Sequence, residues 1–188
     1  MKKIFAFIAI AMFAVASYGK ASEKQLQLTN AEGVAVIFDA TKKANVEIVF
    51  AENCTASYQG TQFIPFATYV ELNKEWDEEW AEASKGFAQD WNSRNKKGMR
   101  ITTGDADYKI IIKINSFKEM AAFNVWWEIV DGSVEIVENL SNRTIVAYNI
   151  NEYYEGVSGF KALKLRNRIK ETLAGLSESC LYFAKKKL

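Results

Sequence analysis

The sequence predicts an α+β fold, a mostly antiparallel sheet of about five strands with two long helices packed on one face. Short runs of β-favouring residues with period-two alternation follow one another in the second half of the chain. Two longer segments repeat apolar residues every three or four positions, as amphipathic helices do. The elements follow the order strand, irregular stretch, helix, meander of strands and helix. This order favours helices gathered on one side of the sheet.

The chain of 188 residues begins with a segment that is separate from this fold. Two lysines precede a 13-residue uncharged apolar run, Ile4–Ala16, and small residues follow it. This order is typical of a secretory signal peptide, here residues 1–19 with cleavage after Ala16, Gly19 or Ala21. A membrane span needs about 20 apolar residues, so the run is short for an anchor. We expect an exported protein, periplasmic or secreted, with no membrane span after signal cleavage.

The charge balance limits the classes of partner, and the positions of the two cysteines bear on lipid anchoring. Without Lys2 and Lys3, 22 basic residues face 23 acidic ones, and the net charge of −1 gives no general attraction to nucleic acid or anionic lipid. Neither cysteine follows the apolar run, where a lipoprotein carries its acylated cysteine, so we expect no lipid anchor. A disulfide between Cys54 and Cys180 is one alternative in an oxidising compartment. The other is that Cys180 is a buried free thiol.

The first half of the predicted domain is less regular than the second. Residues 20–33 are polar and predicted to be loose, and residues 34–188 form a single α+β domain. Val34–Phe38 is a fully apolar run that predicts a central strand. Residues 45–69 contain turn residues and little periodicity, with one candidate strand at Val46–Phe50. We interpret this region as an irregular excursion.

A long helix is predicted from Asn73 to about Lys97. Acidic residues fill its first turns and basic residues its last turn, as the helix dipole favours, and Gly98 follows as a stop. The acids between Glu75 and Glu82 are interpreted as a solvated face. The apolar face comprises Leu72, Trp76, Trp80, Ala83, Phe87 and Trp91.

A meander of strands and a final helix complete the predicted domain. The dipeptide Asp131-Gly132 is typical of a tight hairpin turn between two of the strands. The predicted strands are Met99–Thr102, Tyr108–Phe117, Phe123–Val130, Ser133–Val137 and Thr144–Ile150. The final helix runs from about Phe160 to Lys187. Its apolar face comprises Ile169, Leu173, Leu176, Cys180 and Phe183.

The absence of histidine removes much catalytic chemistry. Histidine is the commonest general base near neutral pH and the commonest metal ligand. Ser-His-Asp and Cys-His sites are therefore excluded, and two cysteines cannot complete a tetrahedral zinc site. Asp105 and Asp107 match only half of a calcium loop, so we interpret their segment as a turn. We expect a non-enzymatic protein with no cofactor and no metal.

The face of the sheet that points away from the helices is the candidate binding surface. Adjacent strand residues point to opposite faces, so Trp126 and Trp127 cannot share one. If Trp127 faces the helices, Trp126 and Glu128 lie on the other face. By the same alternation that face also carries Lys109, Ile111, Lys113 and Phe117. The mixture of aromatic, aliphatic and charged groups leaves two alternatives, a solvated or partly covered sheet face and a binding surface.

The strand texture resembles a known envelope fold. The segments that carry the resemblance are VAVIFDA (34–40), DADYKIIIKINSF (105–117), FNVWWEIVDG (123–132) and TIVAYNI (144–150). They look like the α+β fold of the TolB amino-terminal domain, of the outer-membrane lipoproteins that activate penicillin-binding proteins, and of similar small exported proteins. The resemblance implies a periplasmic adaptor without an active site. The lipid-carrying cysteine and a following propeller are missing, and no functional residue is carried over.

We therefore predict an exported, non-enzymatic adaptor that binds another envelope protein through its sheet face or edge. The candidate contact residues are Lys109, Ile111, Lys113, Trp126 and Glu128.

Two alternatives from other classes remain. A carboxylate-dependent hydrolase of glycan or peptide needs two acids that converge in a cleft, such as Asp105 or Asp107 with Glu128. A small-ligand carrier that uses the aromatic residues around Trp126 needs an enclosed apolar pocket of at least about 300 Å³.

Overall fold

The computed structural model describes residues 22–58, 62–121, 125–155 and 164–188. The predicted signal peptide lies outside the described residues. The fold is α+β, as predicted, but the sheet is larger than predicted and is mixed. Its seven strands are β1 (Leu26–Asn30), β2 (Lys43–Tyr58), β3 (Ile64–Pro65), β4 (Arg100–Ile101), β5 (Tyr108–Ala121), β6 (Val125–Glu138) and β7 (Arg143–Tyr154). The strand order is β1-β7-β6-β5-β2-β3, with β4 also paired to β2.

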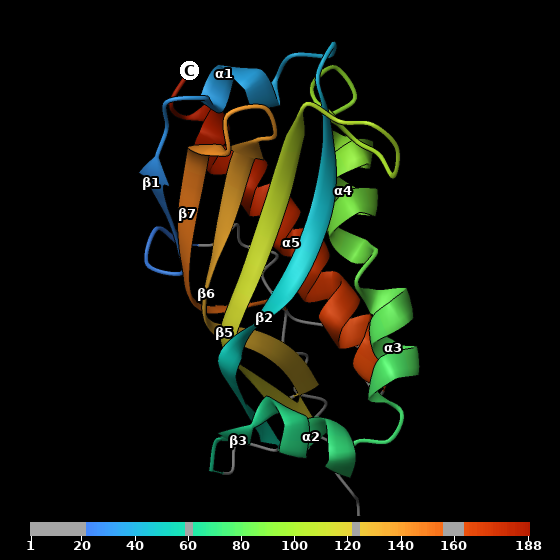
Figure 1. Ribbon diagram of the computed structural model, residues 1–188. Coiled ribbons are helices and arrows are strands. Elements are labelled where there is room, and N and C mark those ends of the chain that lie inside the picture. The colour runs from blue at the N-terminus through green and yellow to red at the C-terminus, as the bar shows by residue number, and fades with distance from the viewer. Residues whose placement is uncertain (1–21, 59–61, 122–124, 156–163) are drawn as a thin grey trace, which may run out of the picture.

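The helices cover one side of this sheet. The helices are α1 (Val34–Ile37), α2 (Phe66–Leu72), α3 (Trp76–Ala83), α4 (Gly86–Arg94) and α5 (Leu165–Lys185). α3, α4 and α5 lie together on one side of the sheet, α1 lies at one end of the molecule, and α2 lies at the other end (Figure 1). Alternate residues of β5 point into the core, and Tyr108, Ile110, Ile112 and Ile114 are buried as predicted. The predicted apolar face of α5 is buried as well.

The sheet is not the antiparallel meander that was expected, because two of its pairings are parallel. β2 pairs with β5 and with β4 in parallel, while the β5–β6, β6–β7 and β1–β7 pairs are antiparallel. β1 was missed, since residues 20–33 were predicted to be loose. Leu26 and Leu28 alternate with glutamines in that segment, which is the period-two pattern of a strand.

The run Val34–Phe38 was wrongly predicted to be a strand. It forms the single turn α1, and Val34 and Ile37, three positions apart, are its buried residues. The carbonyl of Ile37 accepts hydrogen bonds from the backbone N–H of Met99 and from the Asn95 side chain. A short apolar run does not distinguish a strand from a buried helical turn by periodicity, and here tertiary contacts at its end favour the turn.

The predicted helix of residues 73–97 is two helices, α3 and α4, which both pack against α5. The break lies just before Gly86, where an added Cβ atom would sit 2.6 Å from the carbonyl oxygen of Lys170. Such close approach of α4 to the backbone of α5 requires glycine there. Trp76, Phe87 and Trp91 are buried as predicted, whereas Leu72 belongs to α2 and is 75% exposed.

The predicted hairpin at Asp131-Gly132 does not exist, because β6 continues through both residues. The ladder with β5 pairs Ile114 with Gly132 and then Ser116 with Asp131, so the register shifts here. A Cβ atom on Gly132 would lie 2.4 Å from the carbonyl oxygen of Lys113. The glycine therefore permits a close approach between strands at a bulge, and it makes no turn.

Bulges interrupt three neighbouring strands at the same level of the sheet. Asn115 is the extra residue in β5, Val130 the extra residue in β6, and residues 51–54 the extra segment in β2. The single extra residue in β5, and likewise that in β6, reverses whether even- or odd-numbered residues face the core. Phe117, predicted on the outer face, is therefore fully buried. Residues 45–58, predicted to be an irregular excursion, are mostly the long strand β2 with this interruption in it.

Candidate functional site

The five predicted contact residues do not form one cluster. Lys109, Ile111 and Lys113 lie on β5 before the bulge, and Lys109 forms an ion pair of 3.1 Å with Glu47 on β2. Trp126 and Glu128 lie on β6 beyond the bulge, where Glu128 pairs with Lys118. Lys113 and Lys118 are five residues apart on one strand, a distance of roughly 17 Å. Lys109, Ile111 and Lys113 therefore form one surface, and Trp126 and Glu128 form a separate one.

Trp126 and Glu128 already have interaction partners within the protein. The indole N–H of Trp126 donates a hydrogen bond of 3.2 Å to Glu128, whose other oxygen lies 3.6 Å from the ammonium group of Lys118. Glu128 is buried, and the ring of Trp126 packs against the exposed Tyr154 at 5.7 Å between centroids. The charge of Glu128 is already matched by a neighbour, so this group is a weaker contact surface than its composition suggested.

The edge of β2 is the more open feature of the sheet. Among the described residues, β4 pairs with β2 only at Lys43 and Ala44, and β3 pairs with it only at Thr55 and Ala56. Between these two short strands, residues 45–54 of β2 have β5 on one side and no described strand on the other. The regular part of this interval, residues 45–50, spans about 20 Å.

The backbone of β2 offers hydrogen-bonding groups along this open edge. The carbonyls of Lys42 and Ala44 accept hydrogen bonds from the backbone N–H groups of Arg100 and Thr102. The backbone groups of even-numbered residues therefore point toward the edge. The carbonyl of Lys43 accepts from Asp107, on the β5 side. Because N–H and C=O directions alternate along a strand, Val46, Ile48 and Phe50 present their backbone groups to the edge. An additional strand of four to six residues would fit there and pair with β2.

A groove of about 870 Å³ runs beside the edge. It separates β2 from α3 and α4, and the side chains of Val46 and Ile48 are only partly buried. Its wall combines five apolar residues with six polar or charged ones. The residues that line it are Asn45, Val46, Ile48, Trp80, Ser84, Lys85, Ala88, Gln89, Ile101, Thr102 and Thr103. Edge and groove together give an incoming strand both backbone partners and a place for alternate side chains.

A second cavity, of about 510 Å³, lies at the other end of the helix layer. α2, α3, the start of α5 and the ends of β2 and β5 surround it. Its lining includes a buried group in which Tyr69 and Arg168 both bind the carboxylate of Glu119. Burial, and then the charge of Glu119, raise the pKa of Tyr69 far above its ordinary value, so the phenol keeps its proton. Glu79 accepts a hydrogen bond of 2.7 Å from the backbone N–H of Arg166 at the start of α5.

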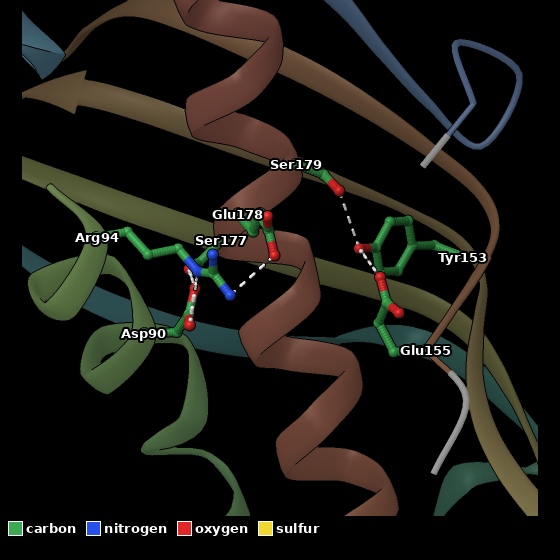
Figure 2. A network of polar contacts seen from close by, with 7 residues as sticks. All are labelled: Asp90, Arg94, Tyr153, Glu155, Ser177, Glu178 and Ser179. Atoms are coloured by element: carbon green, nitrogen blue, oxygen red, sulfur yellow. Dashed lines mark hydrogen bonds and ion pairs between the residues drawn. The ribbon is translucent and has the colours of Figure 1, made fainter. Parts of the chain in front are cut away.

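Polar side chains also tie α4 and β7 to α5 (Figure 2). Asp90 on α4 accepts from Ser177, and Arg94 forms ion pairs with Asp90 and with Glu178, each at 2.9 Å. On the opposite side of α5, the hydroxyl of Tyr153 contacts Glu155 and Ser179, both at 3.1 Å. Burial raises the pKa of Glu155 above its ordinary value. Every one of these groups has a partner inside the protein, which indicates a structural role.

The acids proposed for a hydrolase lie far apart. Asp107 directly precedes Tyr108 at the start of β5, whereas Glu128 pairs with Lys118, ten residues further along the strand. That separation is roughly 33 Å, so neither Asp107 nor the neighbouring Asp105 converges with Glu128. Within the described ranges, no group of three or more Cys, Asp or Glu side chains has the arrangement of a metal site.

The structure holds Cys54 and Cys180 as buried free thiols and not as a disulfide. Burial raises the pKa of the Cys54 thiol to about 11 and that of the Cys180 thiol still higher, so neither is an activated nucleophile. In the part of the chain that the structure describes, no helix has the length and apolar character that crossing a membrane requires.

No family model matches the sequence, and no curated protein matches it. Some solved structures are similar. The PelC dodecamer from Paraburkholderia phytofirmans is 14% identical, with 83% of this chain and 95% of that chain covered and a TM-score of 0.39. A DUF330 protein from Xanthomonas campestris is 10% identical, with 78% and 87% covered and a TM-score of 0.37. At TM-scores below 0.4 these similarities carry no argument about this protein.

Proposed function

We propose that the protein is an exported, non-enzymatic adaptor that binds an extended segment of another envelope protein along the open edge of β2. The observation that carries the proposal is that edge, to which Val46, Ile48 and Phe50 direct their backbone groups, beside a groove that Val46 and Ile48 line. Extended peptides commonly bind by adding a strand to a sheet edge, where backbone hydrogen bonds supply affinity and pockets select alternate side chains.

The groove indicates the kind of segment that fits. The apolar part of its wall is formed by Val46, Ile48, Trp80, Ala88 and Ile101. Alternate side chains of the incoming strand point into this wall, so we expect apolar side chains at every second position. β4 and β3 occupy the two ends of the edge and limit the added strand to a short segment. The basic and apolar N-terminal segment of the sequence supports export, and the absence of histidine supports a role without catalysis.

The test is capture of a partner from solubilised cell envelope, with wild type compared against Val46→Pro. Proline removes the N–H that points to the edge, and its ring obstructs an added strand, while the pairing with β5 uses the odd-numbered residues. The partner should be retained by wild type and lost by Val46→Pro. Hydrogen exchange on the isolated complex should show new protection at the amides of Val46, Ile48 and Phe50.

The control variant is Lys113→Glu on the outer face of the sheet. Lys113 is exposed on β5, away from the edge, so this variant should capture the partner as wild type does. Circular dichroism confirms that both variants fold. Loss of the partner from Lys113→Glu with retention by Val46→Pro would move the contact to the sheet face and refute the edge. A complex without added amide protection in β2 would refute it too.

The cavity at α2 favours a second candidate function, that of a small-ligand carrier. Its volume of about 510 Å³ suits a small organic molecule, and it combines the exposed Tyr58 and Leu72 with the polar group at Glu119. Trp126, the residue first considered for such a role, is not among the residues that line it. Mass spectrometry of the purified protein should detect a co-purifying molecule that Asn73→Trp loses. A wild-type protein without any such molecule counts against this candidate.

A further inference from the structure

Lysines gather at the end of the molecule where α4 and α5 finish. Both helices run toward the end where the C-terminus lies (Figure 1). Lys96 and Lys97 lie shortly after α4, Lys185 is the last residue of α5, and Lys186 and Lys187 follow it. Arg94, Lys96, Lys97 and Lys185 line a single hollow of about 690 Å³. We call the five lysines at positions 96, 97, 185, 186 and 187 the basic end.

The helix dipoles account for only part of this charge. Each helix C-terminus carries the equivalent of about half a negative charge, so two adjacent ends offset about one lysine. Two acids lie close to these residues: Glu178 pairs with Arg94, and Glu23, 3.8 Å from Lys186, offsets one of the five lysines. After the helix dipoles and Glu23, about three of the five lysine charges remain, although the chain as a whole is nearly neutral.

Apolar side chains accompany the lysines. Leu188 directly follows them and is 70% exposed. Leu140, in the turn between β6 and β7, is 97% exposed, and Figure 1 places that turn at the same end of the molecule. Hydrogen bonds connect the two regions, from Gly33 before α1 to Ile145 on β7 and from Asn95 after α4 to Ile37. Within the hollow, Tyr182 is half-buried, and Lys186 lies over its ring at 4.6 Å.

We propose that the basic end docks onto the surface of a membrane rich in anionic phospholipid, with Leu140 and Leu188 entering the interface. Clustered lysines bind anionic headgroups, and nearby apolar side chains add affinity by burial in the interface. A soluble polyanion would use the lysines alone, and the protruding leucines favour the lipid surface. The even charge balance of the sequence did not predict this, because the fold brings together two lysine clusters that are about 90 positions apart. The β2 edge lies on the side of the sheet and stays accessible in this orientation.

The experiment is sedimentation of the purified exported protein with vesicles of phosphatidylcholine alone, and of equal parts phosphatidylcholine and phosphatidylglycerol. Wild type should bind the mixed vesicles much more tightly, and high salt should release it. Each lysine near an anionic surface contributes roughly a fivefold factor, so Lys96→Gln with Lys97→Gln and Lys185→Gln should weaken binding on the order of a hundredfold. Leu140→Ser with Leu188→Ser should weaken the binding that persists at high salt.

The matched control neutralises three exposed lysines elsewhere, with Lys74→Gln, Lys113→Gln and Lys170→Gln. It changes the net charge equally and should bind as wild type does. Equal loss in both triple variants, or equal binding to both kinds of vesicle, overturns the proposal. Binding of single-stranded DNA without binding of mixed vesicles overturns it as well, and assigns the lysines to a soluble polyanion. Val46→Pro should bind vesicles as wild type does. The vesicle result therefore does not depend on whether the edge of β2 binds a partner.

Discussion

The hydroxyl of Tyr69 donates a hydrogen bond of 2.5 Å to Oε2 of Glu119, and Arg168 binds the other oxygen of the same carboxylate. All three side chains are buried. We predict that Glu119→Gln lowers the free energy of unfolding by about 3–5 kcal/mol, because it removes one partner of a buried ion pair. Urea denaturation measures the change.

An exposed ion pair supplies the comparison. Lys109 and Glu47 lie 3.1 Å apart on the outer face with nearly half of each side chain exposed. Glu47→Gln should cost less than about 1 kcal/mol, because solvent screens the pair. A loss for Glu119→Gln as small as that of Glu47→Gln would show that water reaches the carboxylate of Glu119 in solution.

Gly86→Ala should destabilise the protein by about 1–3 kcal/mol. In an ordinary helix the same change would stabilise by up to about 1 kcal/mol. The added Cβ atom meets the backbone of Lys170 and forces α4 away from α5. Thermal unfolding of the variant is compared with that of Gly104→Ala, where an added Cβ atom makes only an ordinary contact of 3.9 Å with the Thr102 hydroxyl. A higher melting temperature for Gly86→Ala would contradict the close helix contact.

The stability of the protein should depend on the protonation of Glu155. Burial raises its pKa above the ordinary value of 4.5, and the charges of Glu178 and Glu171 raise it further. The folded state therefore holds this proton more tightly than the unfolded state does. Its contribution to stability is complete below pH 4.5 and is lost as the pH rises through the raised pKa.

Glu155→Gln should remove this part of the pH dependence while its amide oxygen still accepts from Tyr153. Unfolding in urea at a series of pH values, with the exposed Glu52→Gln as control, measures the effect. A pH profile identical to that of wild type would show that Glu155 is solvated in the folded state.

Both thiols should be unreactive in the folded protein and free after unfolding. The raised pKa of Cys54, about 11, leaves little thiolate at neutral pH, and Cys180 is fully buried. A thiol-specific reagent should modify neither residue in native buffer and both in denaturant without reductant. Failure to detect thiols in the denatured protein would establish the Cys54–Cys180 disulfide instead.

The elements that could be predicted from the sequence are those with a local cause. The apolar face of α5 and the inward side of β5 follow from periodicities of about 3.6 and 2, which depend only on neighbouring residues. The parallel pairing of β2 with β5 joins segments about 60 positions apart, with α3 and α4 between them. No local pattern contains that information. Turn chemistry was misleading at Gly132, where the glycine serves a contact across strands.

The candidate site was less predictable than the fold. Lys109 and Trp126 share a face by alternation, but the bulges between them separate the two groups. The open edge of β2 depends on where β3 and β4 stop, which only the assembled sheet defines. Val46–Phe50 was recognised as a candidate strand, yet its position beside a groove could not be derived from its own composition.

At the bulge at Asn115, the alternate residues of β5 exchange the two faces of the sheet. Before it, even-numbered residues of β5 enter the core, and after it odd-numbered residues do. If β5 passed through Asn115 in regular alternation, without the bulge, Phe117 and Glu119 would turn outward in exchange for Lys118 and Met120. The buried partner of Arg168 is thus set by the bulged backbone at Asn115, four positions upstream, whose own side chain points elsewhere, to Asp131.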